Sequence, residues 1–100
     1  MLHTVNKSPF GSQSLETCLG LAQKGSDVLL IEDGVYGALS KTKHSNMLNE
    51  VLNNINVYVL GPDLKARGVE EDRIIEGIKV VDYKGFVELA IVNDKVQSWL

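Results

Sequence analysis

The segment from Asp27 to Gly34, DVLLIEDG, contains four consecutive apolar residues, Val28 to Ile31, between polar and turn-forming residues. A short apolar run that is bounded by turn formers is typical of a β-strand. Because the run has no polar side to present to water, it predicts a strand buried on both faces, as strands of parallel sheets are. The segment therefore indicates a sheet that is covered by helices on both sides.

Strand-like and helix-like segments alternate outward from this run. The expected strands are residues 2–5, 28–31, 57–60 and 78–81, and the expected helices are residues 14–24, 45–55, 63–67 and 83–92. Ser12 or Ser14 is expected to cap the first helix, Asp63 the third and Asp82 the last. Short connections between alternating strands and helices predict a parallel sheet layered between helices. We therefore expect an α/β fold, a small three-layer, doubly wound domain with a mainly parallel sheet of four to five strands.

Two apolar patterns near the end of the sequence bear on packing. The last expected helix carries apolar residues that are expected to line one of its faces, namely Tyr83, Phe86, Val87, Ala90 and Ile91. The sequence then ends on Trp99 and Leu100. Two large apolar residues at this position suit either an interface with another protein or a tail that folds back onto its own domain.

Length and composition restrict the class of protein. A chain of 100 residues supports one modest core, so residues 1–100 are expected to form a single domain. The net charge is −3 and basic residues are scattered, which makes direct nucleic-acid binding improbable. No apolar run is long enough for a membrane span, and the first ten residues lack the pattern of a signal peptide. With a single cysteine, no internal disulfide is possible, and a cytoplasmic location is expected.

Three loops are candidates for a functional site, because ligands of parallel sheets gather where strands end and helices begin. These loops are residues 6–10, 32–36 and 61–63. Within the second loop, Glu32 and Asp33 are expected to form a turn with a helix cap, since adjacent strand residues point to opposite faces. His3 and His44 lie far apart in the sequence, and no glycine-rich phosphate motif is present. We therefore expect no metal site and no cofactor.

Cys18, the only cysteine, is the remaining chemical candidate. It lies with Leu15, Leu19 and Ala22 at the spacing of a helix stripe that faces a core, where free cysteine is common. It also lies near the start of the expected helix, where the helix dipole favours a thiolate. The local pattern leaves both a packing role and a reactive role open.

Read from end to end, the sequence resembles the DsrH/TusB family of sulfur-relay proteins. The matching stretches are MLHTVNKSPF, SLETCL, LLIEDGVY, VYVLGPDLKARG, VVDYKGFVEL and the closing SWL. The resemblance implies a DsrE-like fold. It also implies a cytoplasmic hetero-hexamer, built from two copies each of three related subunits, in which DsrE/TusD-like and DsrF/TusC-like chains are the partners.

The resemblance further implies a function in moving sulfur as cysteine persulfide to a downstream acceptor protein. TusBCD complexes serve 2-thiolation of the tRNA wobble uridine, and DsrEFH complexes serve dissimilatory sulfur oxidation. The main sulfur-accepting cysteine of both complexes belongs to another subunit. Cys18 in SLETCL is similar to SLESCL of DsrH-type chains, which favours the DsrH side. Two hypotheses follow: Cys18 is a persulfide carrier, or the chain is a non-catalytic scaffold in which Cys18 is packed.

Overall fold

Strands and helices alternate along the whole sequence, as predicted. The computed structural model describes every residue from Met1 to Leu100. Its elements are β1 (Leu2–Val5), α1 (Ser14–Leu21), β2 (Asp27–Leu30), the 3-10 helix η1 (Glu32–Ala38), α2 (Ser45–Val51), β3 (Asn56–Leu60), α3 (Gly61–Ala66), the 3-10 helix η2 (Glu71–Arg73), β4 (Lys79–Val81), α4 (Tyr83–Val92) and β5 (Val96–Trp99). The strands form one five-stranded sheet in the order β4-β3-β2-β1-β5, and every neighbouring pair is parallel. The predicted α/β fold with a parallel sheet is confirmed.

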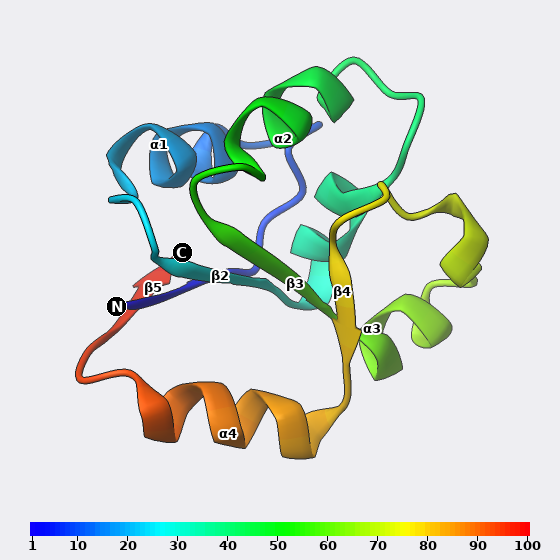
Figure 1. Cartoon of the computed structure of the whole chain (residues 1–100). Coiled ribbons are helices and arrows are strands. Elements are labelled where there is room, and N and C mark those ends of the chain that lie inside the picture. The colour runs from blue at the N-terminus through cyan, green and yellow to red at the C-terminus, as the bar shows by residue number, and fades with distance from the viewer.

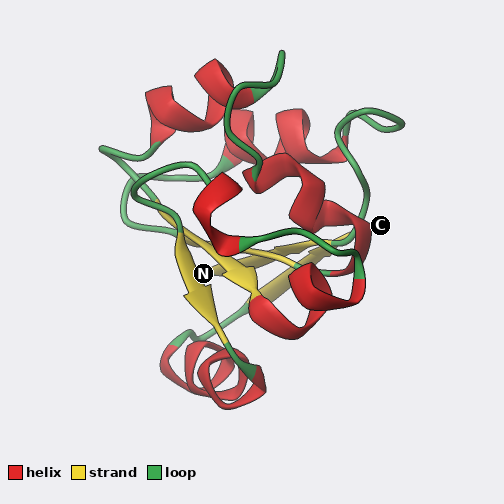
Figure 2. Ribbon diagram, turned by 90° about the vertical axis from the view of Figure 1, so that its right-hand side faces the viewer, coloured by secondary structure: helices red, strands yellow, loops and turns green.

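Helices cover both faces of the sheet, but unequally. Figure 1 shows α1 and α2 on one face and α4 on the other, and the turned view in Figure 2 shows α4 alone on its side. The first face holds a core cluster of 17 buried residues. The second holds a cluster of only 3 buried residues, Leu2, Leu29 and Leu89. We call these the thick face and the thin face.

Strand β2 contributes to both faces, as its apolar run predicted. Val28 and Leu30 belong to the thick-face cluster, whereas Leu29 belongs to the thin-face cluster. All three side chains are fully buried. The alternation of side chains along a strand makes a continuous apolar run necessary here, because each face needs its own apolar residues.

Helix α4 lies on the sheet with a different set of residues from the predicted one. Phe86, Leu89 and Ala90 pack against the thin face. Tyr83, Val87 and Ile91 are exposed by 60%, 56% and 75%. The predicted single apolar face is therefore wrong: the apolar residues form two stripes, and only one of them meets the sheet. We call Tyr83, Val87 and Ile91 the outer stripe of α4.

The end of the chain folds back onto the sheet. Strand β5 pairs with β1, with Trp99 opposite Val5. The indole Nε1 of Trp99 donates a hydrogen bond to Nδ1 of His3 over 3.1 Å, and the Trp99 side chain packs against the thick-face cluster. Burial lowers the pKa of His3, with a further contribution from the N-terminal amine, so the neutral ring accepts this bond. Trp99 therefore packs against its own domain, which is one of the two roles expected for it. Leu100 remains 84% exposed.

Two of the predicted helix caps differ from the structure. Gln13 precedes α1 without a capping side chain, and Ser12 Oγ instead accepts the backbone N–H of Ser14 over 3.1 Å. Helix α3 begins at Gly61, so Asp63 lies inside its first turn and does not cap it. The cap at Asp82 is confirmed, because its Oδ1 accepts the backbone N–H of Gly85 over 2.8 Å.

Candidate functional site

The second and third predicted loops come together at the carboxyl ends of β2 and β3. Oδ2 of Asp63 accepts the backbone N–H of Glu32 over 2.6 Å. Nε of Arg67 donates to Oδ1 of Asp33 over 3.0 Å. Glu32 has a φ of 49°, in the left-handed region, so the Asp63 carboxylate holds a strained turn in place. These acidic groups are used to join η1 to α3, and they do not form a catalytic carboxylate pair.

The first predicted loop lies against η1 rather than in a shared cavity. A Cβ atom at Gly34 would lie 2.1 Å from the carbonyl oxygen of Val5, so only glycine allows this approach. The side-chain oxygen of Asn6 is buried in the same region without a hydrogen-bond partner. The ring of Phe10 meets His44 edge-on, with centroids 4.9 Å apart. The loop of residues 6–10 therefore packs against η1 and His44.

Cys18 lies inside the thick-face core. Its side chain is fully buried in the same cluster as Leu15 and Leu19, as the helix stripe predicted. Its carbonyl oxygen accepts the N–H of Ala22 over 2.9 Å, so Cys18 lies in the body of α1. Burial raises the pKa of the Cys18 thiol to about 12. At pH 7 the thiolate fraction of such a group is about 10⁻⁵, and the sulfur has no path to a donor in this conformation.

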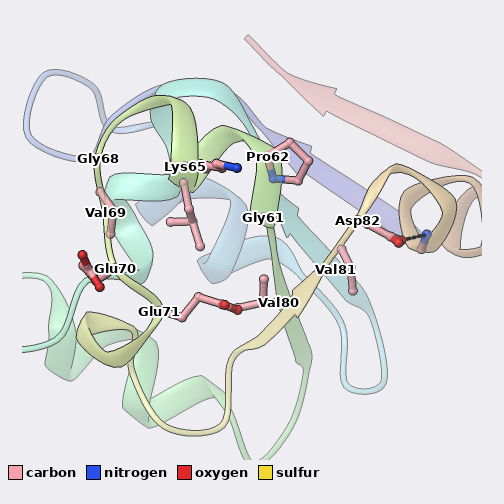
Figure 3. Close-up of a pocket in the computed structure, with 12 residues that line it drawn as sticks. Gly61, Pro62, Lys65, Gly68, Val69, Glu70, Glu71, Val80, Val81 and Asp82 are labelled. Carbon is pink, nitrogen blue, oxygen red and sulfur yellow. Dashed lines mark hydrogen bonds between the residues drawn. The ribbon is translucent and has the colours of Figure 1, made fainter.

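A pocket of about 820 Å³ opens at the carboxyl ends of β3 and β4. Figure 3 shows it between α3 with the turn that follows on one side, and β4 with the start of α4 on the other. Its charged residues are one cation, Lys65, and three carboxylates, Glu70, Glu71 and Asp82. Gly61 and Pro62 from the third predicted loop line it, whereas the first two loops do not.

Most residues of this pocket are not indicated by the sequence pattern. The rule that sites form at strand ends, applied to the fourth expected strand, would have added Asp82. No sequence signal relates Glu70 and Glu71 to Asp82, because they precede β4 and reach the pocket through the path of the connecting turn. The wall formed by Glu70 and Glu71 could therefore be identified only from the tertiary structure.

No group of three or more His, Cys, Asp or Glu side chains is arranged to hold a metal ion. None of the helices has the length and the apolar character needed to cross a bilayer. The side chains that line the pocket offer carboxylates, one amine and apolar surface.

Comparison with known proteins relates the whole chain to one family. The family model described as DsrH like protein matches residues 7–96. Protein TusB of Erwinia tasmaniensis is 40% identical over 99 residues, covering 99% of this chain and 100% of that protein. Protein TusB of an Escherichia coli O1:K1 strain is 34% identical over 99 residues, with the same coverage. The crystal structure of the ychN protein from E. coli has the same fold, with a TM-score of 0.81, 22% identity and 97% of each chain covered. The chain belongs to the DsrH family.

Proposed function

We propose that this protein is one subunit of a cytoplasmic sulfur-relay complex that moves persulfide sulfur toward 2-thiolation of the wobble uridine in tRNA. The observation that carries this proposal is the match to the DsrH family over residues 7–96. The relatives named TusB match this chain along their full length. The resemblance to TusB, a component of TusBCD complexes, supplies the pathway.

Cys18 is the reason to consider a second pathway, dissimilatory sulfur oxidation. The stretch SLETCL favours the DsrH side and thus oxidative sulfur metabolism. The relatives named TusB favour tRNA thiolation. The genes beside this one distinguish the two: genes for a tRNA thiolation pathway support the proposal, and genes for dissimilatory sulfur oxidation would transfer it to the other branch.

The outer stripe of α4 supports a role in an assembly. Tyr83, Val87 and Ile91 are each more than half exposed, and Val92 beside them is 74% exposed. A helix that is apolar on both its inner and outer sides is typical of one covered on both sides. We propose that DsrE/TusD-like and DsrF/TusC-like sister subunits join this chain in a hetero-hexamer, and that a sister subunit covers this stripe.

Sulfur transfer in such a complex requires an accessible thiolate. The thiolate attacks the outer sulfur of a donor persulfide, a new sulfur–sulfur bond forms, and the donor leaves as a thiolate, with no net oxidation. Cys18 has neither access nor a low pKa in this structure. Its burial favours the scaffold hypothesis, in which this chain positions a sister subunit whose cysteine carries the sulfur to the acceptor protein.

Persulfide labelling tests the role of Cys18. The complex and a Cys18→Ala variant are incubated with a persulfide donor, and the intact mass of each subunit is measured. We expect a gain of one sulfur atom on a sister subunit in both samples, and none on this chain. A sulfur adduct on this chain that disappears in Cys18→Ala would instead establish the carrier hypothesis.

Co-expression with the sister subunits tests assembly. We expect co-purification and a hetero-hexamer by size-exclusion chromatography with mass determination. Val87→Glu places a charge in the outer stripe and should abolish assembly, while Thr17→Glu, an exposed position on α1, adds the same charge on the thick face and should not. A chain that stays a monomer beside all its sister subunits would refute the proposed function.

A further inference from the structure

The pocket at the carboxyl ends of β3 and β4 contains an open strand edge. Strand β4 pairs only with β3, so it is an edge of the sheet. Val80 is opposite Val59 in the register and shares its face, but Val59 is fully buried and Val80 is 37% exposed. Val80 and Val81 line the pocket opposite α3 and the turn that follows it, so the unpaired strand β4 borders the pocket. An uncovered edge of this kind is a template for another extended chain.

Close packing around two glycines fixes the floor of the pocket. A Cβ atom on Gly61 would lie 3.1 Å from Cγ1 of Val80, and one on Gly85 would lie 2.9 Å from Cβ of Val81. A side chain at Gly85 would force Val81 to move and one at Gly61 would be in tight contact with Val80, so the first turns of α3 and α4 pack closely against β4. The pocket walls are held by this packing, which makes the shape of the site preformed.

The charges that face the pocket select the kind of occupant. Asp82 uses Oδ1 to cap α4, whereas the carboxylates of Glu70 and Glu71 have no hydrogen bond or ion pair in the structure. Arg67, three positions before Glu70, is bound to Asp33. With Lys65 as its only cation, the pocket carries net negative charge. A phosphate backbone is repelled by such a surface, and a basic side chain is attracted.

We propose that this pocket binds an extended segment of a partner protein that pairs with the free edge of β4 and alternates apolar with basic side chains. The apolar side chain packs against Val80, and the basic side chain reaches Glu70 and Glu71. Addition of a strand to a sheet edge takes its affinity from backbone hydrogen bonds and its specificity from alternate side chains. The volume of about 820 Å³ is adequate for such a segment. That the partner belongs to the sulfur relay rests on the proposed function. The charge and shape of the pocket do not depend on that function.

The test uses the full chain, labelled with ¹⁵N, and a short acetylated and amidated peptide of alternating valine and lysine. We expect shifts of the backbone amides of Val80, Val81 and Gly85 during titration, with a dissociation constant of about 1 mM or below. The same peptide with glutamate in place of lysine, or with N-methylated valines that cannot pair with a strand, should not produce these shifts.

Paired charge variants sharpen the test. The double variant Glu70→Gln with Glu71→Gln should weaken peptide binding about fivefold to tenfold, since exposed ion pairs are worth up to about 1 kcal/mol each. Glu16→Gln with Glu50→Gln removes the same charge from exposed positions on α1 and α2 and should leave the affinity unchanged. All four positions are exposed, so neither variant threatens folding.

Three outcomes would overturn the inference. Equal binding of the lysine and glutamate peptides would remove the charge selection, and shifts of equal size with spermidine would make the pocket a small-cation site. Absence of shifts at Val80, Val81 and Gly85 with every peptide would remove the site. Since the isolated chain is used, such a failure leaves assembly with the sister subunits intact, and a failure of assembly leaves the peptide result intact.

Discussion

The thick and thin faces of the sheet are built from the same strands but are stabilised very differently. Helices α1 and α2 with η1 bury a cluster of 17 residues on the thick face, whereas α4 alone covers the thin face with a cluster of 3. The outer side of α4 is itself apolar. The outer side of α1, a helix of the thick face, is less apolar, because it exposes Leu21 among polar residues. The thick face therefore holds most of the buried core of the isolated chain, whereas the thin face carries the helix with the exposed outer stripe.

The connection of the strands causes this asymmetry. Strands β4 and β5 lie at opposite edges of the sheet, and α4 is the only helix that joins them. Its 10 residues span about 15 Å, while five strands span about 19 Å across the sheet. One helix cannot cover the whole thin face, so Val96 on β5 remains 50% exposed.

The largest effect is expected from a matched pair on β2. Leu30→Ala should lower the free energy of unfolding by about 4 kcal/mol and Leu29→Ala by about 2–3 kcal/mol, because the smaller cluster around Leu29 can collapse into the space more easily. Both side chains are fully buried, so the difference reports on the faces alone. Urea unfolding of the two variants measures it. An equal or larger loss for Leu29→Ala would break the distinction between the faces.

A second pair separates the two stripes of α4. Leu89→Ala should cost about 2 kcal/mol in the isolated chain, since Leu89 packs against the thin face. Ile91→Ala removes a side chain that is 75% exposed and should cost less than about 0.5 kcal/mol. Urea unfolding of the isolated chain checks both values. If Ile91→Ala were as destabilising as Leu89→Ala, the outer stripe would already be covered in the monomer.

Burial of Cys18 in the thick face predicts a loss of stability at high pH. The pKa of the thiol is raised from 9.0 to about 12, so above pH 9 the unfolded state loses a proton that the folded state keeps. The free energy of unfolding should therefore fall by about 1.4 kcal/mol in total between pH 8 and pH 10, and the slope should approach about 1.4 kcal/mol per unit only above about pH 10. Cys18→Ala lacks this loss, and urea midpoints of both chains from about pH 8 to pH 10 compare the slopes. Parallel slopes would mean that the thiol is accessible, which would revive the carrier hypothesis.

The smallest effect is expected where neither face is involved. Arg67→Ala removes the ion pair to Asp33, whose side chain is 62% exposed. Exposed pairs contribute about 0–1 kcal/mol, so we expect a loss of about 0.5 kcal/mol or less. Thermal unfolding at low and high salt measures it, and salt should remove most of the difference. A loss comparable with that of Leu89→Ala would show that the contact between η1 and α3 matters as much as the thin face.

Local sequence signals predicted the parts of the fold that depend on neighbouring residues. The run from Val28 to Ile31 predicted burial on both faces, and Asp82 was identified as a cap. Asp63 was also predicted to cap a helix, and that prediction is wrong, because its carboxylate accepts the backbone N–H of Glu32, which is 31 positions away in the sequence. The face of α4 was also predicted incorrectly, since helical spacing groups apolar residues but does not identify which group meets the sheet.

The candidate site was predictable to a smaller extent. Gly61 and Pro62 follow a strand end and were expected near a site, whereas the wall formed by Glu70 and Glu71 was not expected. The position of Cys18 on a core-facing stripe was expected, but its access to solvent was left open. Whether a thiol can react depends on water and charges around it, and these come from elements that helical spacing does not describe.

The order and type of the first four strands and of the four α-helices were determined by the sequence alone, because apolar periodicity and turn residues act over a few neighbouring positions; β5 was not predicted. The tertiary structure decided which strand lies at each edge, which stripe of α4 remains exposed and what surrounds Cys18. These depend on the free energy of burying surfaces that distant segments bring together. One continuous apolar run could predict that both faces of the sheet are covered, but only the folded chain shows that one face is covered by a single helix.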